Sequence, residues 1–310
     1  MVGIRNSRAG RWRAVGAKAD LQHGVVSRDQ LRGLGLSETE VDYAVAIGHL
    51  FPVFRGVFAV GRGEVVRNGR LLAAVLACGE GSVVSHGTAA ALLGLWESEP
   101  RLVDVIAPVE AGRKIDGICR RHVPPPLPRD RWSHEGVPCT SPSRTIVDVA
   151  GIVREPSLGR TIEQAAVNGM LNVPEIDAIL AGPRRRGSPR LRGLLDDWRR
   201  YPPAMRIRSP MEAKLLPLLT RYDIPIPRVN ERIEVGGERF EIDFRWPPQR
   251  LCVETDGGKY HGHPIAQARD THRNRVLRRH GYRVHRLSWD DLEVRPAATM
   301  AELSRLLDLA

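Results

Sequence analysis

The sequence predicts a multidomain α/β protein, and three patterns along the chain support this class. Near the N-terminus, three short helical segments precede a hairpin pattern, which is the order of a winged helix-turn-helix. A middle part mixes helical and strand patterns, which indicates an α+β domain. Residues 209–310 follow the order helix, three strands, helix, strand, helix. The 310 residues suffice for two or three domains of ordinary size.

The charge of the chain favours nucleic acid as a partner. The sequence has 47 Lys and Arg against 36 Asp and Glu, a formal net charge of +11. Such a charge attracts nucleic acid through counterion release, and most of it comes from arginine, which suits phosphate. The alternative is a chain from a genome that simply prefers arginine codons.

Cysteine usage and hydropathy exclude several classes of protein. The four cysteines are scattered without a C-x-x-C pair, which argues against a disulfide framework and against a cysteine zinc site. Apolar runs are too short to span a membrane, and the N-terminus lacks the apolar centre of a signal peptide. We therefore expect a reduced, cytoplasmic protein with no membrane contact.

Residues 1–12 carry three arginines among Gly, Ser and Asn and have little to bury. They predict a mobile, disordered basic arm. Contact with phosphate is the alternative role for this arm.

Residues 13–64 predict a winged helix-turn-helix. Its first helix ends at Gly24, and Ser27 caps a second, short helix. Ser37 with Glu40 forms a capping-box pattern that opens the third helix. Two short strands follow within residues 50–60, with a turn at Arg55-Gly56.

Two stretches of this region, Gln22-His-Gly-Val-Val-Ser27 and Phe54-Arg-Gly-Val-Phe-Ala-Val60, resemble the winged helix of AbiEi-like type IV antitoxins. The resemblance implies DNA binding in transcriptional autoregulation. The third helix departs from that role, because it has three acidic residues and no basic one, whereas bases are mostly read by Arg, Lys, Asn or Gln. Arg32, Arg55 and Arg62 are candidates for phosphate contacts. A structural or protein-binding winged helix is the alternative.

Residues 65–182 resemble the middle part of the same family and predict an α+β domain. Helical spacing occurs over residues 70–78 and 85–95, strand patterns occur over 102–107 and 117–123, and Ser141 opens a further helix. His86 follows an N-cap serine, and we interpret it as structural. The region has no metal-ligand or nucleophile–base spacing and is expected to be a scaffold. Residues 183–208 form a basic linker with one short helix, either solvated or lying along DNA.

The C-terminal part, residues 209–310, has four acidic residues in a predicted hairpin around Pro247-Pro248-Gln249. Alternation places Ile242, Phe244, Leu251 and Val253 on one face and Glu241, Asp243, Glu254 and Asp256 on the other. With a two-residue loop, Asp243 lies opposite Glu254, and Glu241 lies opposite Asp256. Like charges directly across a strand pair destabilise a sheet, so this face predicts a divalent cation. The alternative is an acidic, solvent-exposed sheet edge.

Several motifs of this part match a known superfamily. They are Ser209-Pro-Met-Glu212, Glu241-Ile-Asp-Phe-Arg-Trp-Pro247, Val253-Glu-Thr-Asp-Gly257, Tyr260-His261, Arg269-Asp-Thr-His-Arg-Asn274 and Gly281-Tyr-Arg-Val-His-Arg-Leu-Ser-Trp289. With the αβββαβα order, they resemble the PD-(D/E)xK restriction-endonuclease-like superfamily, and within it the domains related to very-short-patch-repair endonucleases. The resemblance implies hydrolysis of DNA phosphodiester bonds with Mg²⁺ or Mn²⁺.

The resemblance also implies roles for individual residues. Asp243 and Glu254 would bind the metal, and Glu212 would complete or orient its shell. The superfamily has a lysine two residues after the second acid, where this chain has Asp256. Either Lys259 or His261 replaces that lysine, or Asp256 binds a second cation. The candidate catalytic residues are therefore Asp243, Glu254, Asp256, Glu212, Lys259 and His261, with His263 less favoured, and the first four are the candidate metal ligands.

Three further residues are candidates for contacts with DNA. Tyr260 would stack on a base, with a core position as its alternative. Arg273 and Arg275 would meet phosphate, with Asp270 orienting them, and the alternative for both arginines is a solvated helix face.

The sequence as a whole favours a metal-dependent DNA endonuclease that a winged-helix module targets or regulates, in DNA repair or phage defence. The alternative is a non-catalytic antitoxin-like regulator whose nuclease-like domain only binds DNA or a partner. The sequence leaves open a homodimer and a cognate toxin or repair partner.

Overall fold

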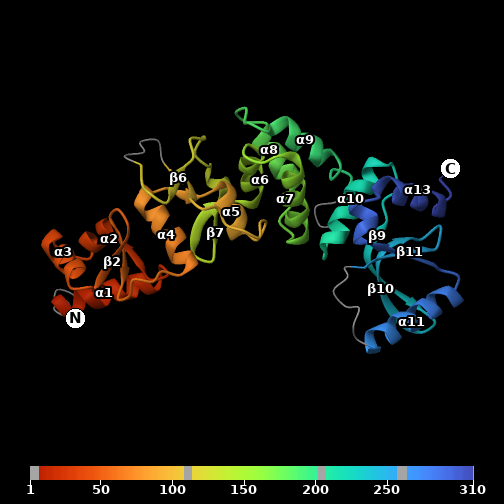
Figure 1. Ribbon diagram of the computed structural model, residues 1–310, viewed down its shortest axis with the longest axis horizontal. Coiled ribbons are helices and arrows are strands. Elements are labelled where there is room, and N and C mark those ends of the chain that lie inside the picture. The colour runs from red at the N-terminus through yellow and green to blue at the C-terminus, as the bar shows by residue number, and fades with distance from the viewer. Residues whose placement is uncertain (1–6, 108–113, 202–206, 257–263, 310) are drawn as a thin grey trace. The chain divides into compact units, whose positions relative to one another are not determined.

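The computed structural model describes residues 7–107, 114–201, 207–256 and 264–309 (Figure 1). The chain divides into two compact units, Met1–Val149 and Ala150–Ala310. The described residues form three separate sheets together with helices, so the predicted multidomain α/β class is confirmed. None of the helices in these ranges has the length and apolar character needed to cross a bilayer.

The first unit begins with a small helical domain that has a three-stranded sheet of order β1-β3-β2. Its elements are α1 (Arg8–Asp20), β1 (Val25–Ser27), α2 (Arg28–Gly33), α3 (Glu38–Ala46), β2 (Leu50–Phe54) and β3 (Val57–Val60). Ser27 with Gln30 and Ser37 with Glu40 form capping boxes that start α2 and α3. The three predicted helices and the hairpin are present. The strand β1 was not predicted, because three residues are too short to show a period.

The predicted basic arm is shorter than residues 1–12. The helix α1 begins at Arg8, and the Ser7 hydroxyl accepts a hydrogen bond from the Gly10 N–H at 3.1 Å. Trp12 packs against the buried cluster that contains Val15, so this segment has an apolar anchor that the prediction overlooked. The prediction was therefore wrong for residues 8–12, and residues 1–6 lie outside the described ranges.

The rest of the first unit surrounds a five-stranded sheet of order β6-β5-β4-β8-β7. Its elements are α4 (Arg67–Cys78), β4 (Val83–Val84), α5 (His86–Leu92), β5 (Val103–Ile106), β6 (Ile118–Arg120), the 3₁₀ turn η1 (Pro128–Asp130), β7 (Arg131–His134), β8 (Val137–Thr140) and α6 (Pro142–Ala150). The β7–β8 hairpin was not predicted. Its turn residues Glu135 and Gly136 both have positive φ (48° and 77°), and glutamate is an unusual residue for that conformation.

The second unit starts with three helices and continues into a four-stranded sheet of order β12-β11-β10-β9. The helices are α7 (Glu155–Val167), α8 (Val173–Leu180) and α9 (Ser188–Asp196). The elements that follow are α10 (Pro210–Arg221), β9 (Arg228–Val235), β10 (Glu238–Trp246), β11 (Leu251–Asp256), α11 (Pro264–Arg279), β12 (Arg283–Ser288), α12 (Trp289–Glu293) and α13 (Pro296–Leu306). The predicted αβββαβα order is present, with α12 as one additional short helix.

The helix α10, which begins this order, packs against the sheet. Figure 1 shows it beside the C-terminal helix α13. The helix α10 buries Leu215, Leu216 and Leu219 and packs against β11 and against α7. The Lys214 ammonium on α10 lies 2.7 Å from the Glu293 carboxylate on α12 and 3.8 Å from the Glu163 carboxylate on α7. The helix α7 therefore belongs to the same compact unit as the C-terminal sheet.

Candidate metal and nucleic-acid site

The hairpin of β10 and β11 has the predicted register but a longer loop. Phe244 pairs with Val253 and Trp246 pairs with Leu251. The loop spans residues 247–250, and the Arg250 N–H donates to the Pro247 carbonyl at 3.1 Å. A two-residue loop would need a backbone pair at Pro247, which has no N–H to donate. The loop prediction was therefore wrong, although the register is unaffected.

The regular pairing changes at Asp243. Counting on from Phe244 and Val253 would place Asp243 opposite Glu254, but the described β10–β11 pairing ends at Phe244. The β9–β10 pairing also skips Asp243, at the point where Asn230 takes a positive φ of 51°. The predicted pair of Glu241 with Asp256 is not part of the described register.

The apolar face of the hairpin is buried, though its alternation is not strict. Ile242, Phe244, Leu251 and Val253 are each fully buried, as predicted. Ile242 nevertheless belongs to the buried cluster of Cys252 and of Leu277 on α11. Because Cys252 and Val253 are adjacent in a strand and face opposite ways, the prediction of one shared apolar face was wrong for Ile242. The irregular backbone at Asp243 is the physical reason.

Asp243 is held by a residue that the sequence analysis did not single out. One oxygen of its carboxylate accepts from the Thr255 N–H at 2.8 Å and from the Thr255 hydroxyl at 2.9 Å. Strict alternation would turn the side chain of Thr255 away from the acidic face, so no sequence signal pointed to this contact. The two bonds fix the orientation of the Asp243 carboxylate on Thr255, the residue that follows Glu254 in β11.

Glu212 lies at the start of α10, where it is 4% exposed. Its Oε2 accepts from the Arg208 N–H at 2.9 Å and from the Asn230 side-chain amide at 2.7 Å. Burial raises the pKa of the Glu212 carboxyl, and the charge of Asp243 raises it further, while hydrogen bonds with Arg208, Asn230 and Ser209 lower it. The structure therefore brings Glu212 into the electrostatic field of Asp243. Asn230 is a second site residue that the sequence did not reveal.

Glu254 is paired with an arginine of α11. The Arg273 Nη2 donates to Glu254 Oε1 and, at 2.7 Å, to the Glu241 backbone carbonyl. The side chain of Glu254 is 14% exposed and that of Arg273 is 24% exposed. Arg273, expected at DNA phosphate, thus faces a candidate metal ligand in this structure. Arg275, two residues further along α11, is exposed.

The remaining candidates of this part fall where side chains are not described. Lys259, Tyr260, His261 and His263 lie outside the described ranges. For Asp256 in β11, and for Arg269 and Asp270 in α11, the structure describes the backbone element and not the side chain.

The donor set fits a hard cation, although it is not an assembled metal site. Among the residues that the structure describes, no group of three His, Cys, Asp or Glu side chains is close enough to hold a metal ion. Asp243, Glu254 and Glu212 all offer carboxylate oxygens, which Mg²⁺ and Mn²⁺ prefer. Burial is the main cause of the raised pKa of Glu212, and the charge of Asp243 adds to it; a divalent cation would offset that negative charge.

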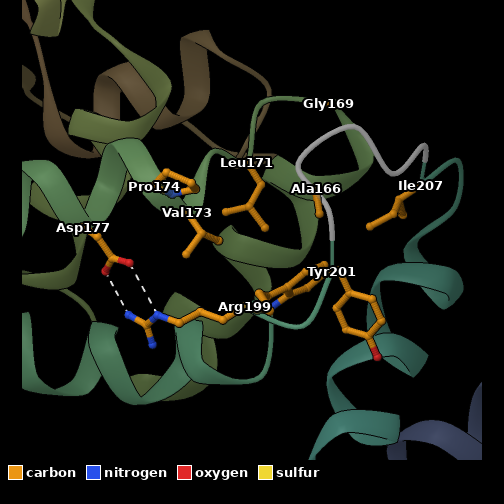
Figure 2. Close-up of a pocket in the computed structure, with 10 residues that line it drawn as sticks. Ala166, Gly169, Leu171, Val173, Pro174, Asp177, Arg199, Tyr201 and Ile207 are labelled. Carbon is orange, nitrogen blue, oxygen red and sulfur yellow. Dashed lines mark hydrogen bonds and ion pairs between the residues drawn. The ribbon is translucent and has the colours of Figure 1, made fainter. Parts of the chain in front are cut away.

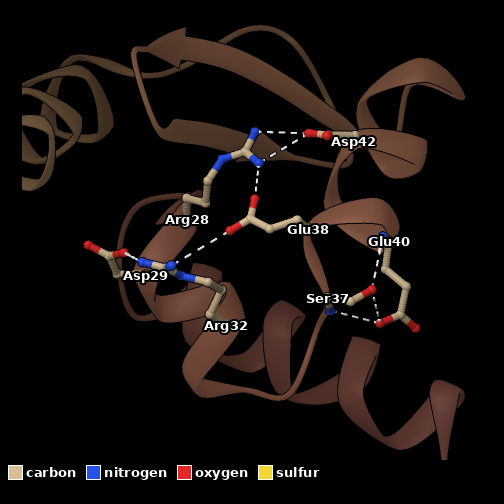
Figure 3. A network of polar contacts seen from close by, with 7 residues as sticks. All are labelled: Arg28, Asp29, Arg32, Ser37, Glu38, Glu40 and Asp42. Atoms are coloured by element: carbon tan, nitrogen blue, oxygen red, sulfur yellow. Dashed lines mark hydrogen bonds and ion pairs between the residues drawn. The ribbon is translucent and has the colours of Figure 1, made fainter.

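The three acidic residues of α3 have arginine partners, and Figure 3 shows those of Glu38 and Asp42. The Arg28 guanidinium donates to Glu38 and, at 3.1 Å, to Asp42, and it lies 5.3 Å from the centroid of the Phe58 ring. Glu40 accepts from Ser37 and from Arg11. These pairs tie α3 to α1 and α2, so the acids of α3 stabilise the domain.

The predicted phosphate contacts of this region differ in how free their side chains are. Arg32 pairs with Asp29 and lies 3.7 Å from Glu38. Arg55, in the turn between β2 and β3, and Arg62, just after β3, are both exposed. The three side chains thus differ in their ion pairs, and their contact with DNA stays a prediction.

A cavity of about 370 Å³ lies elsewhere in the second unit (Figure 2). Its described lining is mostly apolar, and it includes the ion pair of Arg199 with Asp177 at 2.8 Å. The Tyr201 hydroxyl donates to the Leu216 carbonyl at 2.6 Å. None of the predicted site residues is among the described residues that line it, so this cavity is separate from the carboxylate site.

Three family models match the chain. Residues 17–61 match the family described as transcriptional regulator, AbiEi antitoxin, and residues 81–197 match the AbiEi antitoxin C-terminal domain. Residues 225–307 match the restriction-endonuclease family REase_MTES_1575. The resemblances to AbiEi-like antitoxins and to restriction-endonuclease-like domains are thereby confirmed.

Two proteins from Mycobacterium tuberculosis are similar to this chain over most of its residues. The uncharacterized proteins MT2308 (strain CDC 1551 / Oshkosh) and Rv2248 (strain H37Rv) are each 29% identical to this chain over 279 residues, which cover 89% of this chain and 98% of each relative. The crystal structure of the RV2827C protein from Mycobacterium tuberculosis matches with a TM-score of 0.41 and 16% identity, over 73% of this chain and 88% of that one.

Proposed function

We propose that this chain, which joins AbiEi-type antitoxin regions to a restriction-endonuclease-like domain, is a metal-dependent DNA endonuclease whose winged helix targets or regulates cleavage. The observation that carries this proposal is the Asp243 carboxylate, which Thr255 fixes within the electrostatic reach of the buried Glu212; burial raises the pKa of the Glu212 carboxyl, and the charge of Asp243 raises it further. Carboxyl groups with perturbed pKa values are typical of sites that bind metals or transfer protons. DNA repair and phage defence are the proposed settings.

In this proposal, Asp243, Glu254 and Glu212 hold Mg²⁺ or Mn²⁺. The bound cation supplies a water of lowered pKa and offsets negative charge on the phosphate. Thr255 holds Asp243 in one orientation, and Asn230 with the Arg208 N–H does the same for Glu212. Each group is therefore positioned before the cation arrives, which reduces the cost of assembling the site.

Residues whose side chains the structure does not describe, together with the exposed Arg275, complete the proposal. Asp256 adds a carboxylate at the end of β11, and Lys259 or His261 takes the place of the missing lysine as the group that assists the attacking water. Tyr260 stacks on a base, and Arg275 contacts phosphate.

DNA is the proposed partner of both ends of the chain. A transcriptional-regulator domain implies DNA binding, and the exposed Arg55 and Arg62 lie beside the hairpin that would act as a wing. The antitoxin regions suggest a cognate toxin as a protein partner. Because such a regulator works at chromosomal DNA, we also propose a cytoplasmic location.

A second candidate function is supported by the charge around Glu254. Asp256 stands where the superfamily has a lysine, and Arg273 already neutralises Glu254. A domain with this arrangement could bind DNA or a partner without cutting it, in a non-catalytic antitoxin-like regulator.

Cleavage assays separate the two functions. Supercoiled plasmid and duplex, mismatched, single-stranded and flap oligonucleotides are incubated with Mg²⁺ or Mn²⁺ and wild type, Asp243→Asn or Glu254→Gln. Glu234→Gln is the matched control, because Glu234 is an exposed acid of β9 outside the site. We expect cleavage by wild type and by Glu234→Gln, and at least about 100-fold less by the two site variants. Equal background with all four proteins would favour the non-catalytic regulator.

A further inference from the structure

Arg273 is the side chain of this site whose hydrogen bonding is incomplete. Its Nη2 donates both to the Glu254 carboxylate and to the Glu241 carbonyl, as described above. Among the described residues, its buried Nε has no hydrogen-bond partner. A buried donor without a partner costs free energy, so the guanidinium would gain from an arrangement that satisfies it.

Arg273 also supplies a positive charge at Glu254, which the superfamily lysine would supply if Asp256 did not stand in its place. The superfamily lysine would follow Glu254 by two residues on β11, whereas Arg273 reaches Glu254 from α11. A guanidinium has a fork of N–H donors that binds two oxygens of a phosphate at once. The same side chain can therefore neutralise Glu254 or bind DNA.

A divalent cation and Arg273 compete for one carboxylate. Glu254 cannot give its full charge to a metal while it accepts the charge-assisted hydrogen bond from Arg273. Whatever draws Arg273 away from Glu254 favours metal binding, and by linkage metal binding favours whatever Arg273 binds next. A phosphate group of DNA is the ligand that suits a released guanidinium.

We propose, on the basis of the function above, that Arg273 is an exchanging positioning residue that couples metal binding to DNA binding. Without a cation it holds Glu254, and when a cation takes Glu254 it moves to a DNA phosphate. The metal site is thus weak in the absence of DNA and becomes stronger when DNA is bound.

Two titrations test this exchange, with correct folding checked by circular dichroism and thermal unfolding. The first measures Mn²⁺ binding by calorimetry without DNA, and the second measures binding of a fluorescein-labelled DNA oligonucleotide with and without Mn²⁺. The proteins are wild type, Arg273→Gln, Arg273→Lys and two controls. Arg278→Gln changes an exposed arginine of α11, and Arg286→Gln changes the arginine of β12 in register with Glu254.

The exchange predicts effects of opposite sign. Arg273→Gln should bind Mn²⁺ about tenfold more tightly, since a hydrogen bond to a charged group is worth about that factor. The same variant should show a gain in DNA affinity on adding Mn²⁺ that is about tenfold smaller than the gain of wild type. Arg273→Lys should restore part of that gain, and both control variants should behave as wild type in the Mn²⁺ titration.

The outcomes distinguish this inference from the function on which it rests. Unchanged or weaker Mn²⁺ binding by folded Arg273→Gln, with normal binding by wild type, would mean that Arg273 only supports Glu254, and would overturn the exchange alone. Tighter Mn²⁺ binding by Arg286→Gln, equal to that of Arg273→Gln, would also overturn the exchange alone. Absence of Mn²⁺ binding by wild type would overturn the proposed endonuclease and the exchange together.

Discussion

Thr255 donates two hydrogen bonds, from its N–H at 2.8 Å and its hydroxyl at 2.9 Å, to a single oxygen of Asp243. The contact occurs where the regular pairing of β10 with β11 ends. A carboxylate bound in this way has one oxygen fixed by the protein, and its direction is set by the strand that also carries Glu254. The residue between the two acids of the E-x-D pattern therefore has a defined structural task.

Replacing Thr255 with valine should weaken metal binding with little effect on the fold. The variant keeps the N–H bond and the shape of the side chain but loses the hydroxyl, so Asp243 is less well oriented. We expect Mn²⁺ affinity to fall about tenfold, since metal-ligand partners typically contribute 10- to 100-fold. Calorimetric titration measures it. Thr255→Ser, which keeps a hydroxyl, should remain within about twofold of wild type, and an equal loss in both variants would contradict this role.

Glu212 should make the stability of the protein depend on pH. Its pKa is raised in the folded state above its ordinary value, mainly by burial. Its contribution to stability is therefore fully present below the unfolded pKa and is lost as the pH rises through the folded pKa. Glu212→Gln removes this titration, so the free energy of unfolding of the variant should improve relative to wild type as the pH rises above the ordinary pKa of a glutamate, about 4.3.

Urea unfolding of wild type and Glu212→Gln at several pH values measures this difference. The difference in the free energy of unfolding between the two proteins cancels the titration of groups that both share. One such group is Glu163, because burial raises its pKa as well. A difference that stays constant with pH would show that Glu212 does not titrate in this range.

The element order of the C-terminal part could be predicted because its signals are local. Strand periods, glycine turns and the Ser209 cap each lie within a few residues, and the predicted αβββαβα order is present. The partners inside the site could not be predicted, since they depend on departures from regular structure. The positive φ of Asn230 and the break in pairing at Asp243 bring Asn230 and Thr255 to the acids, and neither shows as a period in the sequence.

In the N-terminal part, the ion-pair partners of charged residues likewise could not be predicted from the sequence. The three acids of α3 are evident in the sequence and argue against reading of bases. Their partners Arg11 and Arg28 lie on other helices, so the neutralisation of these acids depends on how α1, α2 and α3 pack. Figure 3 shows the contacts of Arg28 with Glu38 and Asp42. Short elements such as β1 and the hairpin of β7 and β8 were missed because a few residues carry too weak a pattern.

Arg144 should be among the most sensitive positions of the first unit. Its side chain is fully buried, and its Nε donates to the Asp148 carboxylate at 2.9 Å while its Nη2 donates to the Pro124 carbonyl at 2.9 Å. Arg144→Met would leave a buried carboxylate without its cation, which typically costs about 3–5 kcal/mol. Thermal unfolding of the variant should show a large loss of stability, whereas Arg131→Met, at an exposed position of β7, should stay close to wild type. Equal stabilities of the two variants would rule out a structural role for the buried pair.

Arg55 and Arg62 should contribute to DNA binding through phosphate, without selecting sequence. Both side chains are exposed next to the β2–β3 hairpin, while Arg32 is engaged by Asp29 and Glu38. Removing one arginine that binds a phosphate should lower the slope of log K against log salt by about 1. Arg55→Gln and Arg62→Gln should therefore weaken binding to all duplexes alike and flatten the salt response, and Arg32→Gln should change the slope much less. Fluorescence anisotropy with a labelled duplex between about 50 and about 200 mM salt measures both effects. A slope that is unchanged in Arg55→Gln and Arg62→Gln would remove the hairpin from the DNA-binding surface.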